Sequence, residues 1–90
     1  MLRALVACRT GMGSSMMLKI KVEQVIRENN WDIEVEHNEI SAAKYFDGDI
    51  LITMEDLADE FEGASYKVIG IKNLMDKEEI KDKLEKTMES

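Results

Sequence analysis

The chain contains no proline and only one cysteine among its 90 residues. A single cysteine excludes an internal disulfide framework and a cysteine-rich metal knuckle. The absence of proline and of any low-complexity stretch argues against an internal linker. No run approaches the ~18–20 apolar residues of a membrane-spanning helix, and residues 1–15 are too short and too glycine-broken for a secretory signal. We therefore expect a single domain over residues 1–90, in the cytoplasm.

Basic residues are scarce, since 12 Lys and Arg stand against 19 Asp and Glu, a net charge of −7. A basic nucleic-acid footprint is therefore lacking, and we expect no nucleic-acid partner. Residues 1–27 hold five cations and one acid, a net +4, whereas residues 28–65 hold twelve acids and one lysine, a net −11. The positive end of the chain thus surrounds the only cysteine, Cys8. No spacing of side chains typical of a metal site occurs, and no organic cofactor is implied.

Short apolar segments, several of them rich in β-branched residues, predict four strands. They cover residues 2–7, 32–37, 49–53 and 67–71. The second segment alternates between polar and apolar residues, which suits an edge strand with one face in water. The third is almost continuously apolar, as expected of a strand that is buried on both faces.

Helices are expected after each of these strands. They cover residues 15–29, 41–46, 55–61 and a last segment that opens after Asp76. Ser41 is expected to cap the second helix, and Gly63 to end the third. Asp76 followed by Glu79 resembles a capping box at the start of the last helix.

The alternation of strands and helices implies an α/β fold. We expect an open, four-stranded parallel sheet with helices on both faces, in three Rossmann-like layers. In such sheets the site lies at the carboxyl ends of the strands, where the strand order reverses. This places the expected site in the loop after the first strand, beside Thr53 and Met54 at the end of the third.

The loop after the first strand has an unusual composition, Cys8-Arg9-Thr10-Gly11-Met12-Gly13-Ser14-Ser15. A cysteine beside Arg9 and just before a helix N-terminus has two neighbours that favour the thiolate. Gly11 and Gly13 let successive backbone N–H groups converge into an anion nest. Ser14 and Ser15 add hydroxyl donors. The pattern indicates a P-loop-like phosphate cradle with a nucleophilic thiol at its base.

This loop resembles the phosphocysteine loop of enzyme IIB components of the sugar phosphotransferase system. Residues 11–23, GMGSSMMLKIKVE, are most similar to the ascorbate-type branch of the lactose/ascorbate/galactitol group. The resemblance covers the whole chain and is most specific over residues 2–23. It implies a phosphotransferase in which Cys8 takes a phosphoryl group from a phosphohistidine on a IIA partner (EIIA). It further implies that Cys8 passes the phosphoryl group to a sugar held by the membrane-embedded IIC partner (EIIC). The chain would then associate with the membrane only through EIIC.

The resemblance also implies which residues bind the phosphoryl oxygens. They are Arg9, Thr10, Gly11, Met12, Gly13, Ser14 and Ser15. Arg9 departs from the family pattern, in which a small residue often stands at this position. We expect Arg9 to add positive charge near the phosphate without abolishing the role of the loop.

Low-molecular-weight tyrosine phosphatases and arsenate-reducing enzymes present a related alternative. The phosphatases use the spacing Cys-x5-Arg-Ser/Thr, and the arginine position counted from Cys8 is occupied by Ser14. A serine cannot clamp a phosphoryl group bidentately. A chain without proline also lacks an Asp-Pro loop to supply the acid–base residue. Transfer is favoured, and the hydrolase and a non-catalytic binding module with an inert thiol stay open as alternatives.

The first predicted helix carries apolar residues on its outer side. Leu18 and Val22 define its buried face, and at about 100° per residue Met16 and Ile20 point nearly away from it. Together with Met12 and the flanking Lys19, these residues form a candidate docking patch for protein partners beside the cysteine. The alternative is that they are scattered surface hydrophobes.

Overall fold

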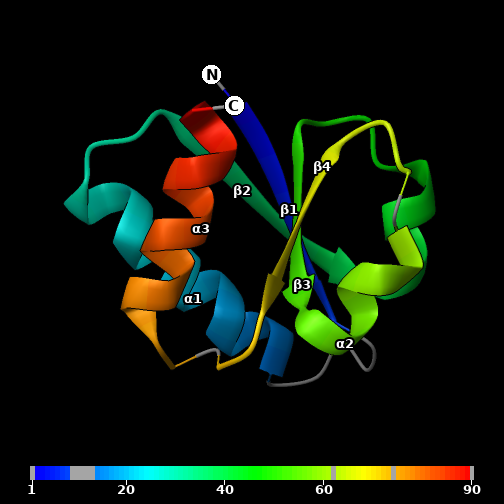
Figure 1. The fold of residues 1–90 in the computed structure, drawn as a ribbon, viewed down its shortest axis with the longest axis horizontal. Helices are drawn as coiled ribbons and strands as arrows, with labels where there is room; N and C mark the ends of the chain where they lie inside the picture. The colour runs from blue at the N-terminus through cyan, green and yellow to red at the C-terminus, as the bar shows by residue number, and fades with distance from the viewer. Residues whose placement is uncertain (1, 9–13, 62, 74, 90) are drawn as a thin grey trace.

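The structure is a computed structural model, and it describes residues 2–8, 14–61, 63–73 and 75–89. At residues 8, 14 and 15 it describes the backbone alone. Strands and helices alternate along the described chain (Figure 1). They are β1 (Leu2–Cys8), α1 (Ser14–Glu28), β2 (Ile33–Glu39), the 3₁₀ helix η1 (Ile40–Tyr45), β3 (Ile50–Met54), α2 (Glu55–Ala58), the 3₁₀ helix η2 (Asp59–Phe61), β4 (Lys67–Ile71) and α3 (Lys77–Glu89).

The strands form one parallel sheet in the order β2-β1-β3-β4. β1 pairs with β2 from Leu2 opposite Ile33 to Cys8 opposite Glu39. Because β1 also pairs with β3, the chain moves to one side of β1 and then returns to the other, and the strand order reverses there. The predicted parallel α/β sheet is confirmed, as is the edge position of β2, whose residues alternate between half-buried and exposed.

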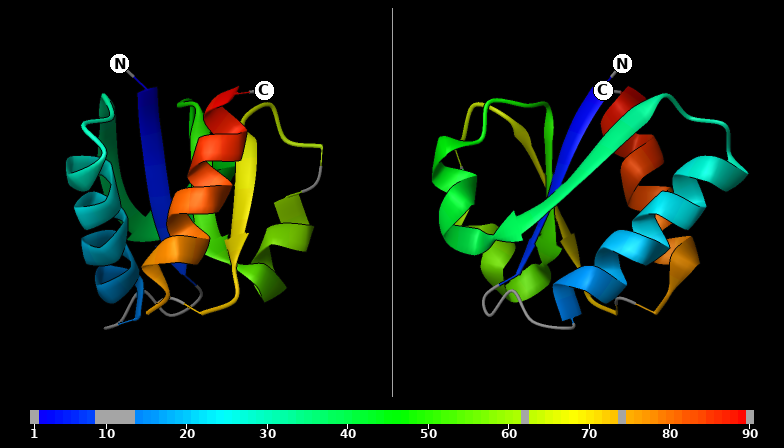
Figure 2. Two further views of the ribbon diagram at one scale, coloured as in Figure 1. Left: turned by 60° about the vertical axis from the view of Figure 1, so that its left-hand side comes forward. Right: turned by 180° about the vertical axis from the view of Figure 1, so that it is seen from behind.

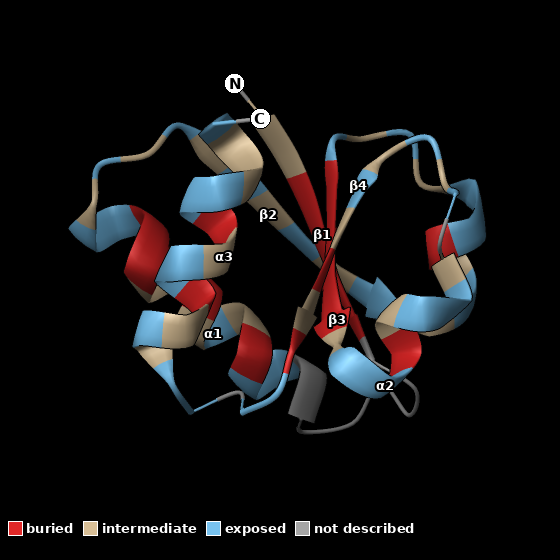
Figure 3. Cartoon of the chain, in the orientation of Figure 1, coloured by how far each residue is buried: buried red, intermediate tan, exposed pale blue. Residues whose placement is uncertain are grey.

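Helices cover both faces of the sheet, which gives the three predicted layers. Figures 1 and 2 show α1 and α3 side by side on one face, and η1 and α2 on the other. The larger core lies under α1 and α3, where Leu18, Val22 and Leu84 meet Val6 and Ile52. Figure 3 shows the buried residues on the helix sides that face the sheet and along the central strands.

β3 is the most deeply buried strand, as its apolar run predicts. Four consecutive residues, Ile50, Leu51, Ile52 and Thr53, have almost no exposed surface. Alternate side chains of a strand point to opposite faces, so Ile50 and Ile52 join the larger core while Leu51 joins the smaller one. Within the described residues, no helix combines the length and apolarity needed to cross a bilayer.

The short helices predicted after β2 and β3 are present, and the cap predicted for the first of them needs correction. The segment after β2 is a 3₁₀ helix rather than an α-helix, and Ser41 lies inside it instead of capping it. β2 continues to Glu39, so Glu39 takes the cap position, without a side-chain hydrogen bond. The segment after β3 is α-helical only to Ala58 and then tightens into η2. Gly63 follows with φ +84°, a left-handed conformation that suits glycine, as expected at this stop.

The capping box predicted for α3 is half correct. The Oδ1 atom of Asp76 accepts hydrogen bonds from the backbone N–H of Glu78 and Glu79, at 3.1 and 3.2 Å, and so caps the helix. The Glu79 carboxylate does not return to Asp76. Its Oε2 and Oε1 atoms instead accept hydrogen bonds from the backbone N–H of Lys72 and Asn73, at 2.7 and 3.0 Å.

The apolar stripe of α3 yields a stability prediction. Leu84 is fully buried in the larger core, so Leu84→Ala should lower the free energy of unfolding by about 2–5 kcal/mol through lost contacts and a residual cavity. Met88 lies one turn further on and is only half-buried, so Met88→Ala should cost distinctly less. Urea unfolding followed by the fluorescence of Trp31, which packs against this core, measures both. Equal losses would contradict the assignment of Leu84 to the core.

Candidate functional site

The carboxyl ends of β1 and β3 meet at the edge of the sheet where the strand order reverses. Cys8 is the last residue of β1 and pairs with Glu39 on one side. Continuing the register of β1 and β3, in which Val6 lies opposite Ile52, brings Cys8 level with Met54 on the other side. The first turns of α1 and α2 lie at the same edge (Figure 1). The switch-point position predicted for the site is thus the position of Cys8.

The strand and helix that frame the cysteine loop are described, and the interior of the loop is not. The predicted loop residues Arg9, Thr10, Gly11, Met12 and Gly13 lie outside the described residues. Ser14 and Ser15 are the first two residues of α1, whose first turn contains no acidic residue. The positive end of the helix dipole therefore lies at the edge of the sheet where β1 ends, without a compensating carboxylate from its own first turn.

Acidic residues border this edge on the side of the short helices. Glu55 and Asp56 open α2 directly after β3, and both are exposed. α2 lies unusually close to β4, because a Cβ atom on Gly70 would be only 3.0 Å from the Cα atom of Glu55 and from the Cβ atom of Ala58. Glycine at position 70 therefore determines how near the acidic first turn of α2 lies to the sheet.

Thr53, which the sequence places beside the expected site, has a buried side chain to which sequence reasoning gave no role. It is fully buried near the carboxyl end of β3, and its Oγ1 atom has no hydrogen-bond partner among the described residues. A buried hydroxyl without a partner costs free energy, so such a group needs an explanation. The available signal was a polar residue inside the otherwise apolar run of residues 50–54.

The apolar outer side of α1 is exposed, as the helical spacing predicts. The exposed fractions are 47% for Met16, 41% for Met17 and 44% for Ile20, whereas Leu18 and Val22 are fully buried. Lys19 lies on the same helix and forms an ion pair with Glu23 at 3.8 Å. Exposed apolar side chains next to the cysteine edge are compatible with a protein-docking surface.

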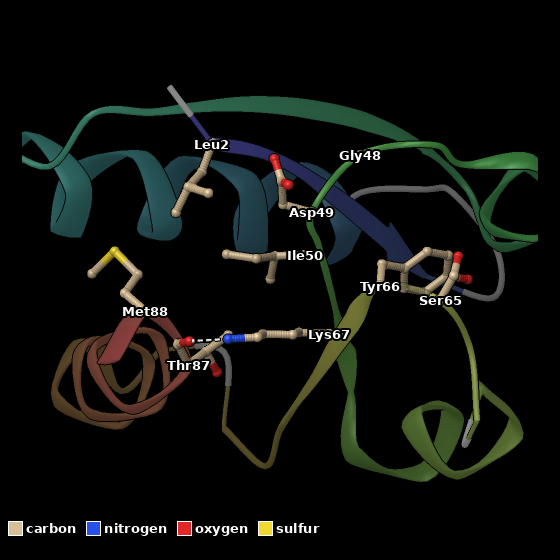
Figure 4. A pocket seen from close by; sticks show the side chains of 9 residues that line it. All are labelled: Leu2, Gly48, Asp49, Ile50, Ser65, Tyr66, Lys67, Thr87 and Met88. Atoms are coloured by element: carbon tan, nitrogen blue, oxygen red, sulfur yellow. Dashed lines mark hydrogen bonds between the residues drawn. The ribbon is translucent and has the colours of Figure 1, made fainter. Parts of the chain in front are cut away.

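The best-defined cavity lies at the opposite edge of the sheet. It has a volume of about 380 Å³ and lies between the amino ends of β1, β3 and β4 and the end of α3 (Figure 4). Its charged groups are already used within the fold: Lys67 donates to the carbonyl oxygen of Thr87 at 2.7 Å, and Asp49 accepts from the backbone N–H of Arg3 at 2.9 Å. Across the described chain, His, Cys, Asp and Glu side chains form no group that could hold a metal ion.

The fold is a parallel α/β sheet covered by helices, and a cysteine ends its central strand β1 at the topological switch point. A family model described as "PTS system, Lactose/Cellobiose specific IIB subunit" matches residues 3–86. The chain belongs to this family of IIB subunits of the phosphotransferase system (PTS), and it is therefore a phosphotransferase component of sugar transport. The resemblance seen in the sequence is confirmed.

Curated relatives support the same assignment. An ascorbate-specific PTS system EIIB component of Mycoplasma pneumoniae is 39% identical over 97% of this chain and 95% of its own length. Proteins with the same description from Shigella dysenteriae and Salmonella typhimurium are 32% and 33% identical. These matches cover 96% and 81% of this chain, and 88% and 75% of the relatives.

The buried hydroxyl of Thr53 leads to a testable expectation. Thr53→Val keeps the shape of the side chain and removes the hydroxyl, so the free energy of unfolding should stay equal or rise by up to about 1 kcal/mol. Chemical unfolding of the two proteins measures the difference. A loss of more than about 1 kcal/mol would contradict the assignment of an unpaired hydroxyl to Thr53.

Proposed function

We propose that Cys8 is the transient phosphoryl carrier of this EIIB component, within a single EIIB domain that spans residues 1–90. EIIA donates the phosphoryl group from a phosphohistidine, and EIIC holds the sugar that receives it. The observation that carries the proposal is the position of Cys8 as the last residue of β1, at the switch point and at the edge of the sheet where α1 begins. Family membership supplies the reaction class.

Two in-line displacements move the phosphoryl group. The thiolate sulfur of Cys8 attacks the phosphorus of the donor, so an S–P bond forms while the N–P bond breaks and its electron pair leaves with the imidazole. A sugar hydroxyl then attacks the same phosphorus, gives its proton to a base at the EIIC site, and releases the thiolate. Because phosphoryl transfer depends mainly on positioning and charge stabilisation, N–H donors carry most of the catalysis.

The phosphoryl oxygens are bound by the loop after β1. In the proposal Gly11 and Gly13 shape the cradle, Ser14 and Ser15 donate hydrogen bonds at the start of α1, and Arg9, Thr10 and Met12 complete it. The first turn of α1 supports this arrangement, since it contains no carboxylate to repel the phosphate.

The sugar is of the ascorbate type, and the carrier works in the cytoplasm. Support for the sugar comes from relatives that are described as ascorbate-specific and that this chain matches over most of their length. The sugar lies on EIIC in this scheme, so this chain contributes the phosphoryl group rather than the sugar pocket. Ser14 at the position of the phosphatase arginine, together with family membership, favours transfer over hydrolysis.

Intact mass tests the carrier role. After incubation with phosphoenolpyruvate, the general phosphotransferase proteins and an ascorbate-type EIIA, the chain should gain the mass of one phosphoryl group. Cys8→Ser should gain none, because an alcohol is a far weaker nucleophile than a thiolate. No gain with a competent EIIA, or phosphate on His37 instead, would refute the proposal. Phosphate release from p-nitrophenyl phosphate would favour the hydrolase.

The docking patch formed by Met12, Met16, Ile20 and Lys19 receives the partners beside the cysteine. Met16 has an exposed side chain, so Met16→Asp should leave the fold intact. The rate of phosphoryl uptake from EIIA should fall, by roughly tenfold if Met16 is an interface anchor, because the new carboxylate must be desolvated on docking. Rapid-quench kinetics measure the rate. An unchanged rate would remove Met16 from the docking patch.

A further inference from the structure

The carboxylate of Glu79 in α3 binds the start of the segment between β4 and α3. Glu79 accepts hydrogen bonds from two successive backbone N–H groups, those of Lys72 and Asn73. The ammonium group of Lys83 donates to Glu79 at 2.7 Å and also to the carbonyl oxygen of Gly70 in β4. Desolvation raises the pKa of Glu79, yet the hydrogen bonds from Lys83 and from these backbone groups hold it below its usual value. The carboxylate therefore stays charged and holds the backbone of Lys72 and Asn73 against α3 at neutral pH.

This segment lies at the edge of the sheet where Cys8 ends β1. All three ribbon views show the chain between β4 and α3 beside the first turn of α1 (Figures 1 and 2). Two of its side chains, those of Lys72 and Met75, are exposed, Met75 by 54%. A cation and an apolar group from the far end of the chain therefore reach the neighbourhood of the proposed phosphorylation site.

Helix geometry adds Met17 to this side of α1. Glu28 forms an ion pair with Lys77 of α3 at 2.6 Å, so its side of α1 faces α3. Met17 precedes Glu28 by about three helical turns and therefore lies on the same side of α1, the side that faces α3. Lys21 follows Met17 by about one turn and lies on this side too. We call the surface on this side the α3-side surface, and it consists of Met17, Lys21, Lys72 and Met75.

The opposite side of α1 has a different character. Ile20 and Met16 lie on the line of Arg27, which borders a cavity against Ile33 and Val35 of β2. Glu34 and Glu36 alternate with Ile33 and Val35 along β2, so they point to the other face of the sheet, where Glu36 pairs with Arg3. The α3-side surface differs from this side of α1 because two of its residues, Lys72 and Met75, come from another part of the chain.

We propose that the α3-side surface is part of the docking site for phosphorylated EIIA, and that Glu79 is its positioning residue. A phosphorylated donor brings a dianionic group and must cover the start of α1 to reach Cys8. Lys21 and Lys72 attract that charge, while Met17 and Met75 supply adaptable apolar contact. The proposal rests on the carrier function proposed above and extends the docking patch across α1 onto a segment about sixty residues further along the chain.

Met75→Asp tests the surface directly. Uptake of the phosphoryl group is measured at a series of phospho-EIIA concentrations, and the apparent KM should rise roughly tenfold while kcat stays unchanged. The matched control is Tyr45→Asp, which places the same charge on another exposed residue, in η1 on the opposite face of the sheet, with an exposed fraction of 87%. Its KM should equal that of the wild type.

Glu79→Gln tests the positioning role. The amide keeps the size of the side chain and removes the charge that holds the two N–H groups, so KM should rise while kcat is retained. Lys77→Met breaks the neighbouring ion pair between α1 and α3 without touching the Glu79 contacts, and its KM should be that of the wild type. Since Glu79 acts through the segment that carries Met75, the double variant Glu79→Gln/Met75→Asp should be no worse than the more severe single variant.

The outcomes distinguish between the α3-side surface, the role of Glu79 and the carrier function. An unchanged KM in Met75→Asp, or an equal rise in Tyr45→Asp, overturns the α3-side surface while normal phosphorylation of Cys8 leaves the carrier function intact. A rise in Met75→Asp with an unchanged KM in Glu79→Gln, or fully additive effects in the double variant, overturns the role of Glu79. If wild-type protein is not phosphorylated on Cys8, the carrier function and this inference fall together.

Discussion

β1 pairs with a parallel strand on each side, and the position of the site depends on this double pairing. With β2 on one side and β3 on the other, connections from both directions meet at its carboxyl end. The residue at that end is Cys8, which pairs with Glu39 of β2. The central strand thus brings Cys8 to the edge of the sheet where the strand order reverses.

The two faces of the sheet are covered by helices of very different length. α1 and α3 bury the larger core, whereas η1, α2 and η2 are short segments over a smaller one. The long helices are anchored in the core by Leu18, Val22 and Leu84. This anchoring leaves the start of α1 to present exposed apolar residues at the cysteine edge without loss of core packing.

The cysteine edge carries charges of both signs. Glu39 ends β2, and Glu55 and Asp56 open α2, whereas Lys21 and Lys72 lie on the α1 and α3 side together with Asp76. In the proposed function these charges steer the encounter and orientation of a partner more than they add affinity. The net charge of −7 alone does not show this local distribution.

Local sequence patterns were sufficient for the elements, the layers and the position of Cys8 at the switch point. Period-two and helical spacing located the strands and long helices, and Asp76 signalled the start of α3, since these signals act between near neighbours in the chain. The tertiary structure alone decided the partners of Glu79, the close approach of α2 to Gly70, the lack of a partner for the Thr53 hydroxyl among the described residues, and the path of the chain from β4 to α3 beside α1. Each of these depends on which distant elements the sheet brings together, and no spacing within one segment encodes that.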